Sequence, residues 1–183
     1  MRKLLFTIIM ILPFMSCEET EVIQYFESGA ISQKTNYVDG VKQGEEIYYY
    51  ESGAIKTKTN FVDGVKQGEM IGYFESGQLK TEGVYKNGFP YSLLESYYEN
   101  GQLEMEELYD KNGQLEEASL FNKNGQLKMR LVYVENGQLQ MRLVYVENGQ
   151  LEMEELYDKN GQLKVKVIYN GDGTETITSY NYE

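Results

Sequence analysis

Few side chains in this sequence could do nucleophilic or acid–base chemistry. The 183-residue chain contains no histidine and one cysteine, Cys17. Schemes that pair serine or cysteine with histidine are therefore excluded, as are zinc sites built from Cys and His. Carboxylates are abundant, with 29 Asp and Glu against 17 Lys and Arg, so a two-carboxylate glycosidase is the scheme left open. These carboxylates lie in near-identical repeats that offer no unique pair, so we expect no catalytic residue, no cofactor and no enzyme activity.

Cys17 suggests a different kind of chemistry. The chain begins MRKLLFTIIMILPFMSC, in which two basic residues precede an apolar run at 4–15. That run is shorter than the about 20 residues of a membrane-spanning helix, as in a signal peptide. The motif FMSC at 14–17 resembles a bacterial lipobox, whose cysteine is linked to a diacylglycerol. The resemblance implies a signal peptide at 1–16, a lipidated Cys17 and an envelope location, at the outer membrane or cell surface. An ordinary signal peptide with an incidental cysteine, or an uncleaved anchor, are the alternatives.

Two short stretches resemble fragments of calcium-binding loops: DKNG at 110–113 and NGDG at 170–173. An EF-hand needs a twelve-residue loop that ends in a bidentate Glu and lies between two helices. Neither stretch has that context, whereas Asp, Asn and Gly are the residues that favour tight turns. The sequence therefore predicts turns at both places and no metal site.

Internal repeats organise the chain after residue 21. A short acidic tether at 17–21 precedes a region at 22–101 in which Ser-Gly and Asn-Gly pairs recur every 24 residues. From 102 to 183 the same pairs recur every 12 residues, and MRLVYVENGQ occurs at both 129–138 and 141–150. Such periods mark repeat architectures. The predicted turn glycines are Gly29, Gly53, Gly77, Gly101, Gly113, Gly125, Gly137, Gly149 and Gly161.

Each repeat reads as one strand followed by one turn. Segments such as QLKMRLVYV are rich in β-branched and aromatic residues, and Asn-Gly between such runs is a strong hairpin signal. Segments such as LEMEELY contain good helix formers, but twelve residues from turn to turn leave too little length for a stable helix. The prediction is an all-β fold. We expect an elongated single-layer antiparallel β-meander of repeated hairpins with about fourteen strands, continuous across both regions.

The repeat length also predicts a register. A three-residue turn at 135–137, with Gly137 in the left-handed region, is a known hairpin class. It pairs Tyr133 with Leu139 and Leu131 with Met141. Under that pairing the apolar side chains of every strand share one face of the sheet.

The opposite face is then charged. It carries alternating Glu and Lys or Arg along neighbouring strands, and it ends in an apolar stripe. Under the predicted register Glu154 lies between Arg142 and Lys166. Exposed ion pairs of this kind contribute up to about 1 kcal/mol each.

A family resemblance follows from two motifs. YVDGVKQG at 37–44, followed by YYYESG at 48–53, resembles the MORN-repeat variant found in bacterial proteins labelled YwqK-family antitoxins. The pattern recurs at 61–68 and partly at 85–88, after which Ser92 replaces the second Gly. The resemblance covers about 22–101, and later residues keep only the shorter half. It implies hairpin ribbons that serve as interaction or membrane-associated scaffolds, and the antitoxin label implies a toxin partner.

Charge and aromatic content limit the classes of ligand and function that are expected. The net charge of −12 argues against nucleic acid and anionic lipid as ligands, so membrane contact is expected through the N-terminal lipid only. The first hypothesis is a scaffold that binds an unknown protein or a glycan through an aromatic face. The alternative is an immunity or antitoxin-like partner of a basic toxin. The expected binding residues are Tyr48, Tyr50, Phe74 and Tyr98, because the 24-residue region has aromatics on both faces.

Overall fold

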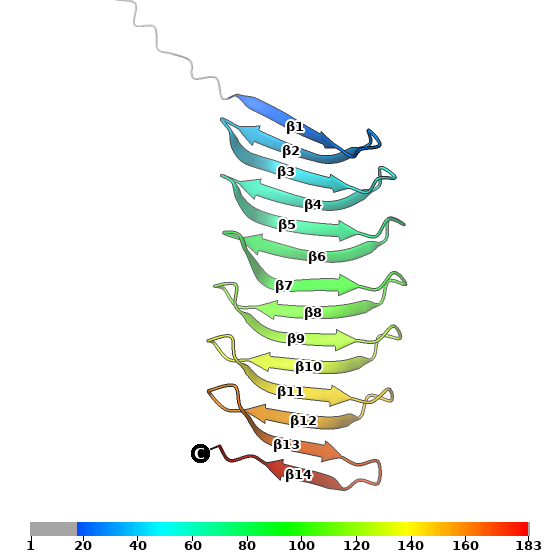
Figure 1. Cartoon of the computed structure of the whole chain (residues 1–183), viewed down its shortest axis with the longest axis vertical. Helices are drawn as coiled ribbons and strands as arrows, with labels where there is room; N and C mark the ends of the chain where they lie inside the picture. Colours follow the sequence, from blue (N-terminus) through cyan, green and yellow to red (C-terminus); the bar gives the residue numbers. More distant parts are fainter. Residues whose placement is uncertain (1–17, 183) are drawn as a thin grey trace, which may run out of the picture.

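The protein forms one antiparallel sheet of fourteen strands that follow each other in sequence order (Figure 1). The computed structural model describes residues 18–182. The predicted all-β single-layer meander is confirmed. The predicted signal peptide at 1–16 and Cys17 lie outside the described residues. Within 18–182 no helix has the length and apolar character needed to cross a membrane.

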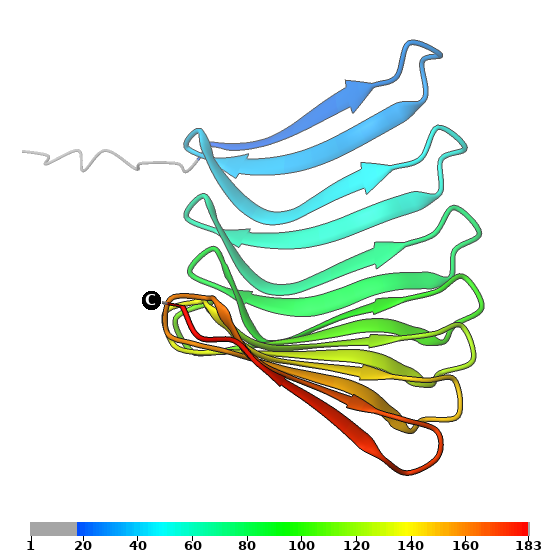
Figure 2. The same ribbon diagram turned by 60° about the horizontal axis from the view of Figure 1, so that its bottom comes forward.

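The strands are longer in the first half of the sheet than in the second. The first seven are β1 Glu19–Tyr25, β2 Ile31–Val38, β3 Val41–Tyr49, β4 Ile55–Val62, β5 Val65–Tyr73, β6 Leu79–Lys86 and β7 Phe89–Tyr97. The second seven are β8 Leu103–Tyr109, β9 Leu115–Phe121, β10 Leu127–Tyr133, β11 Leu139–Tyr145, β12 Leu151–Tyr157, β13 Leu163–Tyr169 and β14 Glu175–Ser179. Figure 2 shows that this single layer twists along its length, as antiparallel sheets do.

Glycine-containing three-residue turns join most strands. In the turn after β10 the Val134 amide donates to the Gln138 carbonyl at 3.0 Å, and the Gly137 amide donates to the Val134 carbonyl at 2.7 Å. Gly137 has a φ of +77°, which L-residues with a Cβ adopt at a cost. All nine predicted turn glycines have φ between +77° and +87°. The turns after β1, β3, β5 and so on form one row, called here the right-hand row from its place in Figure 1.

The opposite, left-hand row changes its turn type along the sheet. After β2 the turn has two residues, Asp39 and Gly40, with φ of +49° and +80°. Positive φ at both positions defines the tight hairpin turn that Asp-Gly favours. Asp63-Gly64 and Asn87-Gly88 repeat this geometry, whereas the turns after β8, β10 and β12 have three residues. The change coincides with the change of repeat length from 24 to 12.

The register differs from the prediction by one residue per turn. Tyr133 pairs with Leu139 as predicted, but Val132, not Leu131, pairs with Met141. Gln140 is therefore an extra residue, a β-bulge, and every side chain beyond it shifts to the other face. The same bulge recurs at the second position of a strand, which is polar in each case: Ser32, Lys56, Lys80, Glu104, Glu116, Lys128, Gln140, Glu152 and Lys164.

The bulges make successive twelve-residue copies present opposite faces. We call face A the side of the sheet that carries Thr35 and Glu46, and face B the side that carries Lys34 and Ile47. Following the pairing strand by strand puts Met129 and Leu131 on face A but Met141 and Leu143 on face B. The expectation that all apolar residues share one face is therefore wrong, and the true structural period is 24 residues throughout.

Charge pairs show the alternation directly. Arg130 binds Glu117 with two hydrogen bonds of 2.6 and 2.8 Å on face B. Arg142, the same residue in the next copy, pairs across strands with Glu155 on face A at 3.2 Å. Glu155, rather than the predicted Glu154, also lies next to Lys166 at 3.4 Å. Glu155 stands where Glu154 was predicted because the bulge at the start of each strand shifts the pairing by one residue.

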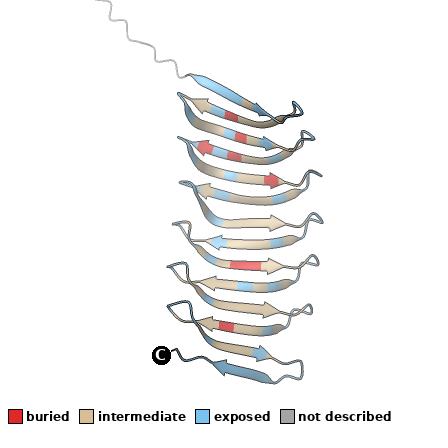
Figure 3. Ribbon diagram, viewed as in Figure 1, coloured by how far each residue is buried: buried red, intermediate tan, exposed pale blue. Residues whose placement is uncertain are grey.

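The sheet has almost no core. Phe61 and Ala118 are the buried hydrophobic residues of the described part, and most strand residues are half-buried (Figure 3). A single layer covers neither face, so stability comes from cross-strand neighbours rather than from a second layer of structure. Many large apolar side chains consequently remain in contact with solvent.

Ser92 is a strained position that a single substitution should relieve. It has a φ of +70°, at the bulge where Gly44 and Gly68 stand in the preceding units. We expect Ser92→Gly to raise the free energy of unfolding by about 0.5–1 kcal/mol, because glycine adopts this conformation without steric cost. Urea denaturation measures the change. The reciprocal variant Gly44→Ser should lose a similar amount, and an unchanged or lower stability for Ser92→Gly would contradict the assignment.

Candidate functional site

Three of the four predicted binding residues lie in the right-hand turn row. Tyr50, Phe74 and Tyr98 each occupy the first position of a turn, where the amide donates to the carbonyl four residues later at 2.8 Å. Successive members are two strands apart, a separation of about 9–10 Å from standard strand spacing. The sequence therefore placed these side chains in a regular row, and the structure shows that the row follows the edge of the ribbon.

Two of these tyrosines also brace the sheet. The Tyr50 hydroxyl donates to the carbonyl of Tyr73 at 2.8 Å, and the Tyr98 hydroxyl donates to the carbonyl of Phe121 at 2.9 Å. Each bond ties one turn to the next turn of the row. Lys56 lies over the Tyr50 ring at 5.7 Å, within the range of a cation–π contact. Part of each ring is thus used within the protein.

Tyr48 does not lie in that row. It is a β3 residue on face A, where it pairs with Gln33 of β2 and Thr57 of β4, and 39% of its surface is exposed. Its neighbours across the strands are polar, so the ring has no apolar partner in those positions. Of the four predicted residues, Tyr48 is the one whose ring is most available to a ligand.

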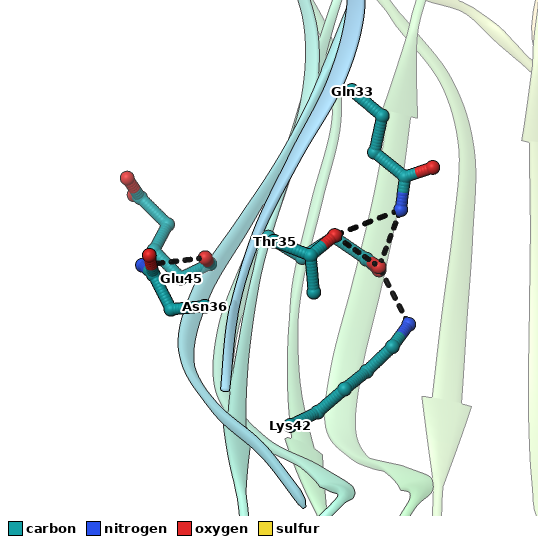
Figure 4. A network of polar contacts seen from close by, with 6 residues as sticks. Gln33, Thr35, Asn36, Lys42 and Glu45 are labelled. Carbon is teal, nitrogen blue, oxygen red and sulfur yellow. Dashed lines mark hydrogen bonds and ion pairs between the residues drawn. The ribbon is translucent and has the colours of Figure 1, made fainter. Parts of the chain in front are cut away.

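A polar network stands beside Tyr48 on face A. The Glu46 carboxylate is 5% exposed and accepts hydrogen bonds from Gln33 at 2.8 Å and Thr35 at 3.2 Å. Lys42 donates to the same oxygen at 2.6 Å, and this hydrogen bond raises the pKa of Lys42. Figure 4 shows Gln33, Thr35 and Lys42 on one side of the strands and Asn36 and Glu45 on the other. With its donors in place, Glu46 is a satisfied structural carboxylate.

Glu155 is the second buried carboxylate of face A. Burial would raise its pKa, but the Tyr157 hydroxyl at 2.9 Å, Lys166 and Arg142 outweigh it and lower the pKa below the ordinary value. Glu46 and Glu155 lie in strands β3 and β12, at opposite ends of the sheet. The two carboxylates therefore do not approach each other, and each is held by its own local partners.

In the two predicted turns that resemble calcium loops, the Asp carboxylates accept hydrogen bonds from residues of the same turn. The Asp110 carboxylate accepts from the amides of Asn112 and Gln114, each at 2.8 Å, and these bonds lower the pKa of Asp110. Asp172 likewise accepts from the Thr174 amide at 2.9 Å and from its hydroxyl. Among residues 18–182 no group of three Cys, Asp or Glu side chains has a metal-binding arrangement.

Face B carries a surface that the sequence did not reveal. A groove of 730 Å³ lies between the turn after β8 and the turn after β10. Its apolar lining is Leu108, Leu115, Val132, Tyr133 and Val134, and its acidic lining is Asp110, Glu116, Glu117 and Glu135. We call it the β8–β10 groove. A register without bulges also puts Leu108 and Val132 on one face, and the bulges bring Glu117 of the strand between them to that face.

A column of carboxylates runs toward this groove on face B. Glu82 of β6 pairs directly with Glu95 of β7, which pairs directly with Glu106 of β8. Within the described residues none of the three forms an ion pair with Lys or Arg. Glu82 accepts a hydrogen bond from the Tyr97 hydroxyl at 2.8 Å. The pKa of Tyr97 is raised mainly by burial and secondly by this hydrogen bond. Like charges directly opposite each other destabilise a sheet.

Comparison with solved structures gives only distant likenesses. A porin-like protein from Bacteroides uniformis is 8% identical over 89% of this chain and 94% of its own, with a TM-score of 0.27. A protein of unknown function from Bacteroides fragilis is 11% identical over 89% and 90% of the two chains, with a TM-score of 0.15.

A crystal structure of the GtfA/B complex bound to UDP and GlcNAc is 14% identical, with a TM-score of 0.33. The match covers 49% of this chain and spans 22% of the length of that one. At these scores none of the three likenesses carries an argument about function. No curated protein matches the sequence.

A family model does match, at four places. The MORN repeat variant matches residues 42–63, 66–87, 93–111 and 153–170. The first three stretches span hairpins of the right-hand row, β3 with β4, β5 with β6, and β7 with β8, whereas the fourth spans β12 with β13, a hairpin of the left-hand row. The last match lies in the twelve-residue region, beyond the part that carried the longer motif. The chain therefore carries MORN repeat variants in both its 24-residue and its 12-residue regions.

Proposed function

We propose that this protein is a non-enzymatic binding scaffold, anchored by a lipid on Cys17 at the bacterial cell envelope, that holds a protein or a glycan on its sheet. One observation carries the proposal. The sheet is a single layer whose two faces are uncovered, and large apolar side chains stay exposed on it, among them Tyr48 and Phe89 at 39% and 59%. Exposed apolar surface of this kind is typical of interaction sites.

The repeat architecture supports the same function. Each unit contacts mainly its neighbours, so copying units lengthens the surface without a new core. The duplicated stretches at 103–115 and 151–163 show that this chain was extended in that way. Extended surfaces built from repeats suit large partners better than small substrates.

A cognate toxin is the second candidate partner, and the acidity of the chain favours it. A net charge of −12 complements a basic protein and steers its approach. A toxin gene beside the gene for this chain, and protection of cells from that toxin by this chain, would distinguish the immunity function from a general scaffold.

Substitution of the predicted aromatic residues tests the binding surface. We expect Tyr48→Ala to weaken partner capture by about tenfold and to leave the circular dichroism spectrum and melting temperature unchanged, because the Tyr48 hydroxyl makes no hydrogen bond within the described residues. The measurement is capture of a cross-linked partner from envelope extracts by the full chain. Tyr50→Ala and Tyr98→Ala should instead lower the melting temperature, since their hydroxyls tie neighbouring turns. Phe74→Ala tests the same row without loss of such a bond.

Lipidation of Cys17 has a direct test. Cells given an alkyne-labelled fatty acid should label the wild-type chain, and the chain should partition with membranes. Cys17→Ala should abolish both the label and the processing of the precursor. Absence of label on the wild type would exclude the lipid anchor and leave the binding proposal to be tested separately.

A further inference from the structure

We propose that the β8–β10 groove, together with the carboxylate column beside it, binds a cationic amphipathic segment of a partner protein. The inference rests on the proposed binding function and names the chemistry of the partner. It concerns face B of strands β6 to β10, a surface separate from the predicted aromatic residues of face A and the right-hand turn row.

The groove offers an apolar floor. Leu108 of β8 and Val132 of β10 lie on either side of β9 on face B, because each is directly paired with Glu117. Leu108 is 39% exposed although its β7 partner across the strands is Leu93. Val134 extends the apolar lining toward the turn after β10. Leu115 and Tyr133 also border the groove, although the register places them on the face opposite to Leu108 and Val132. A side chain of a partner that enters the 730 Å³ groove would therefore remove apolar surface from water.

The charges around the groove have one sign. Asp110, Glu116, Glu117 and Glu135 line it, and no Lys or Arg does. Arg130 already binds Glu117, and the amides of Asn112 and Gln114 already bind Asp110, so Glu116 and Glu135 are left to face a ligand. Complementary charge selects a partner and fixes its register, and here it selects a segment that carries Lys or Arg next to its apolar side chains.

The carboxylate column gives a second reason for a cationic occupant. Glu82, Glu95 and Glu106 are opposed strand by strand, at the about 5 Å separation of paired residues. Glu106 is two residues from Leu108 in β8, on the same face, so the column and the groove are adjacent. A row of Lys or Arg laid along the column would relieve the repulsion that the free protein retains. Phosphate-bearing ligands would be repelled by the same charges.

The duplication inside the chain supplies matched controls. Residues 103–115 and 151–163 are identical, so Leu156 and Glu154 repeat Leu108 and Glu106. Both copies place these side chains on face B. In the second copy, however, Glu154 pairs with Leu143 and Val167, and Lys164 and Val165 take the places of Glu116 and Glu117. The same substitution can therefore be made at the same position of two identical stretches, of which only the first lies in the proposed site.

The test measures binding of a fluorescein-labelled peptide of alternating lysine and leucine to the full chain in non-ionic detergent. Leu108→Ser should raise Kd by about tenfold, as at a central apolar contact, whereas Leu156→Ser should change it by less than about twofold. Glu106→Gln should weaken binding and reduce its salt dependence, and Glu154→Gln should do neither. Replacing Glu116 and Glu117 by Lys and Val, the residues of the second copy, should abolish binding while the fold is kept.

Three outcomes would overturn the inference. The first is equal binding of a lysine–serine peptide, which would show attraction by net charge alone. The second is an equal effect of the Leu108 and Leu156 variants. The third is an envelope partner whose capture depends on Tyr48 but is unaffected by Leu108→Ser and Glu106→Gln, a result that would retain the scaffold and reject this site. Failure to capture any partner would count against the scaffold, whereas groove-dependent peptide binding would still support the site.

Discussion

Deletion of Val132 alone should lower the melting temperature by roughly 6–12 °C, corresponding to a loss of about 3 kcal/mol in the free energy of unfolding, or should cause aggregation. The turn fixes the pair of Tyr133 with Leu139. If the bulge is kept, Leu131 moves opposite Met141, and Arg130 moves to face A opposite Arg142. Arg130 then leaves Glu117, and two guanidinium groups face each other.

Deletion of twelve residues, 130–141, should be far less damaging. It joins Met129 to Arg142 and restores the sequence of β10 letter for letter, because both copies read MRLVYV. One strand is lost, and every remaining turn keeps its bulge, so a soluble β-rich protein is expected. Circular dichroism and thermal unfolding of the two deletions give the comparison. Equal stability, or collapse of the twelve-residue deletion only, would show that the unit is not one strand and one turn.

The same deletion should move the side chains of every downstream strand to the opposite face of the sheet. Because the structural period is 24 residues, removing twelve places Arg142 on face B beside Glu117. A double-mutant cycle should then detect coupling between Arg142 and Glu117 of up to about 1 kcal/mol. In the wild type the two side chains are on opposite faces, so their coupling should be zero. Deletion of 24 residues, 130–153, should leave β13 and β14 with their original faces.

Replacing both cations around Glu155 should reverse the pH dependence of stability. We expect Arg142→Met with Lys166→Met to cost about 2 kcal/mol at neutral pH, because it leaves a buried carboxylate with the Tyr157 hydroxyl as its remaining donor. The cost is below that of a fully buried pair because the Arg142 and Lys166 side chains are 36% and 31% exposed. Glu154→Gln on face B is the control and should have a small effect.

The sign of the pH effect follows from the pKa. In the wild type the pKa of Glu155 is lowered. The Glu155 carboxylate therefore stabilises the folded state fully above the unfolded-state pKa of about 4.3, and this stabilisation is lost as pH falls through the folded-state pKa. In the double variant burial should outweigh the one remaining hydrogen bond from Tyr157 and raise the pKa of Glu155. Its stability should then be greatest below about pH 4 and decline as pH rises. Urea denaturation from pH 3 to 8 measures both curves, and parallel curves would contradict the assigned ion pairs.

The local turn chemistry and the strand count followed from the sequence because both depend on neighbouring residues. Glycine recurs where φ must be positive, and the intervening segments are too short for helices and rich in residues that favour strands. The three-residue turn at Gly137 and the pair of Tyr133 with Leu139 are set within a few residues of the turn. These features therefore do not depend on how the more distant strands pair.

The positions of the candidate binding residues were predictable only in part. The row of Tyr50, Phe74 and Tyr98 follows from the 24-residue period alone, so the sequence placed it. The roles of Tyr50 and Tyr98 as braces did not follow, because each hydroxyl reaches a carbonyl 23 residues away. The β8–β10 groove also did not follow, since it needs three neighbouring strands to present chosen side chains to one face.

The sequence by itself determined that this protein is a β-meander of copied hairpins, with its turns at the glycines and its strands between them. Only the tertiary structure decided which face each side chain occupies. A single bulge residue at the start of a strand inverts the faces of the rest of that strand, and the bulge forms through pairing with the neighbouring strand. The physical cause is that side chains alternate with a period of two, so one extra residue exchanges the two faces of the sheet. Arg130 and Arg142, identical in sequence context, consequently stand on opposite sides.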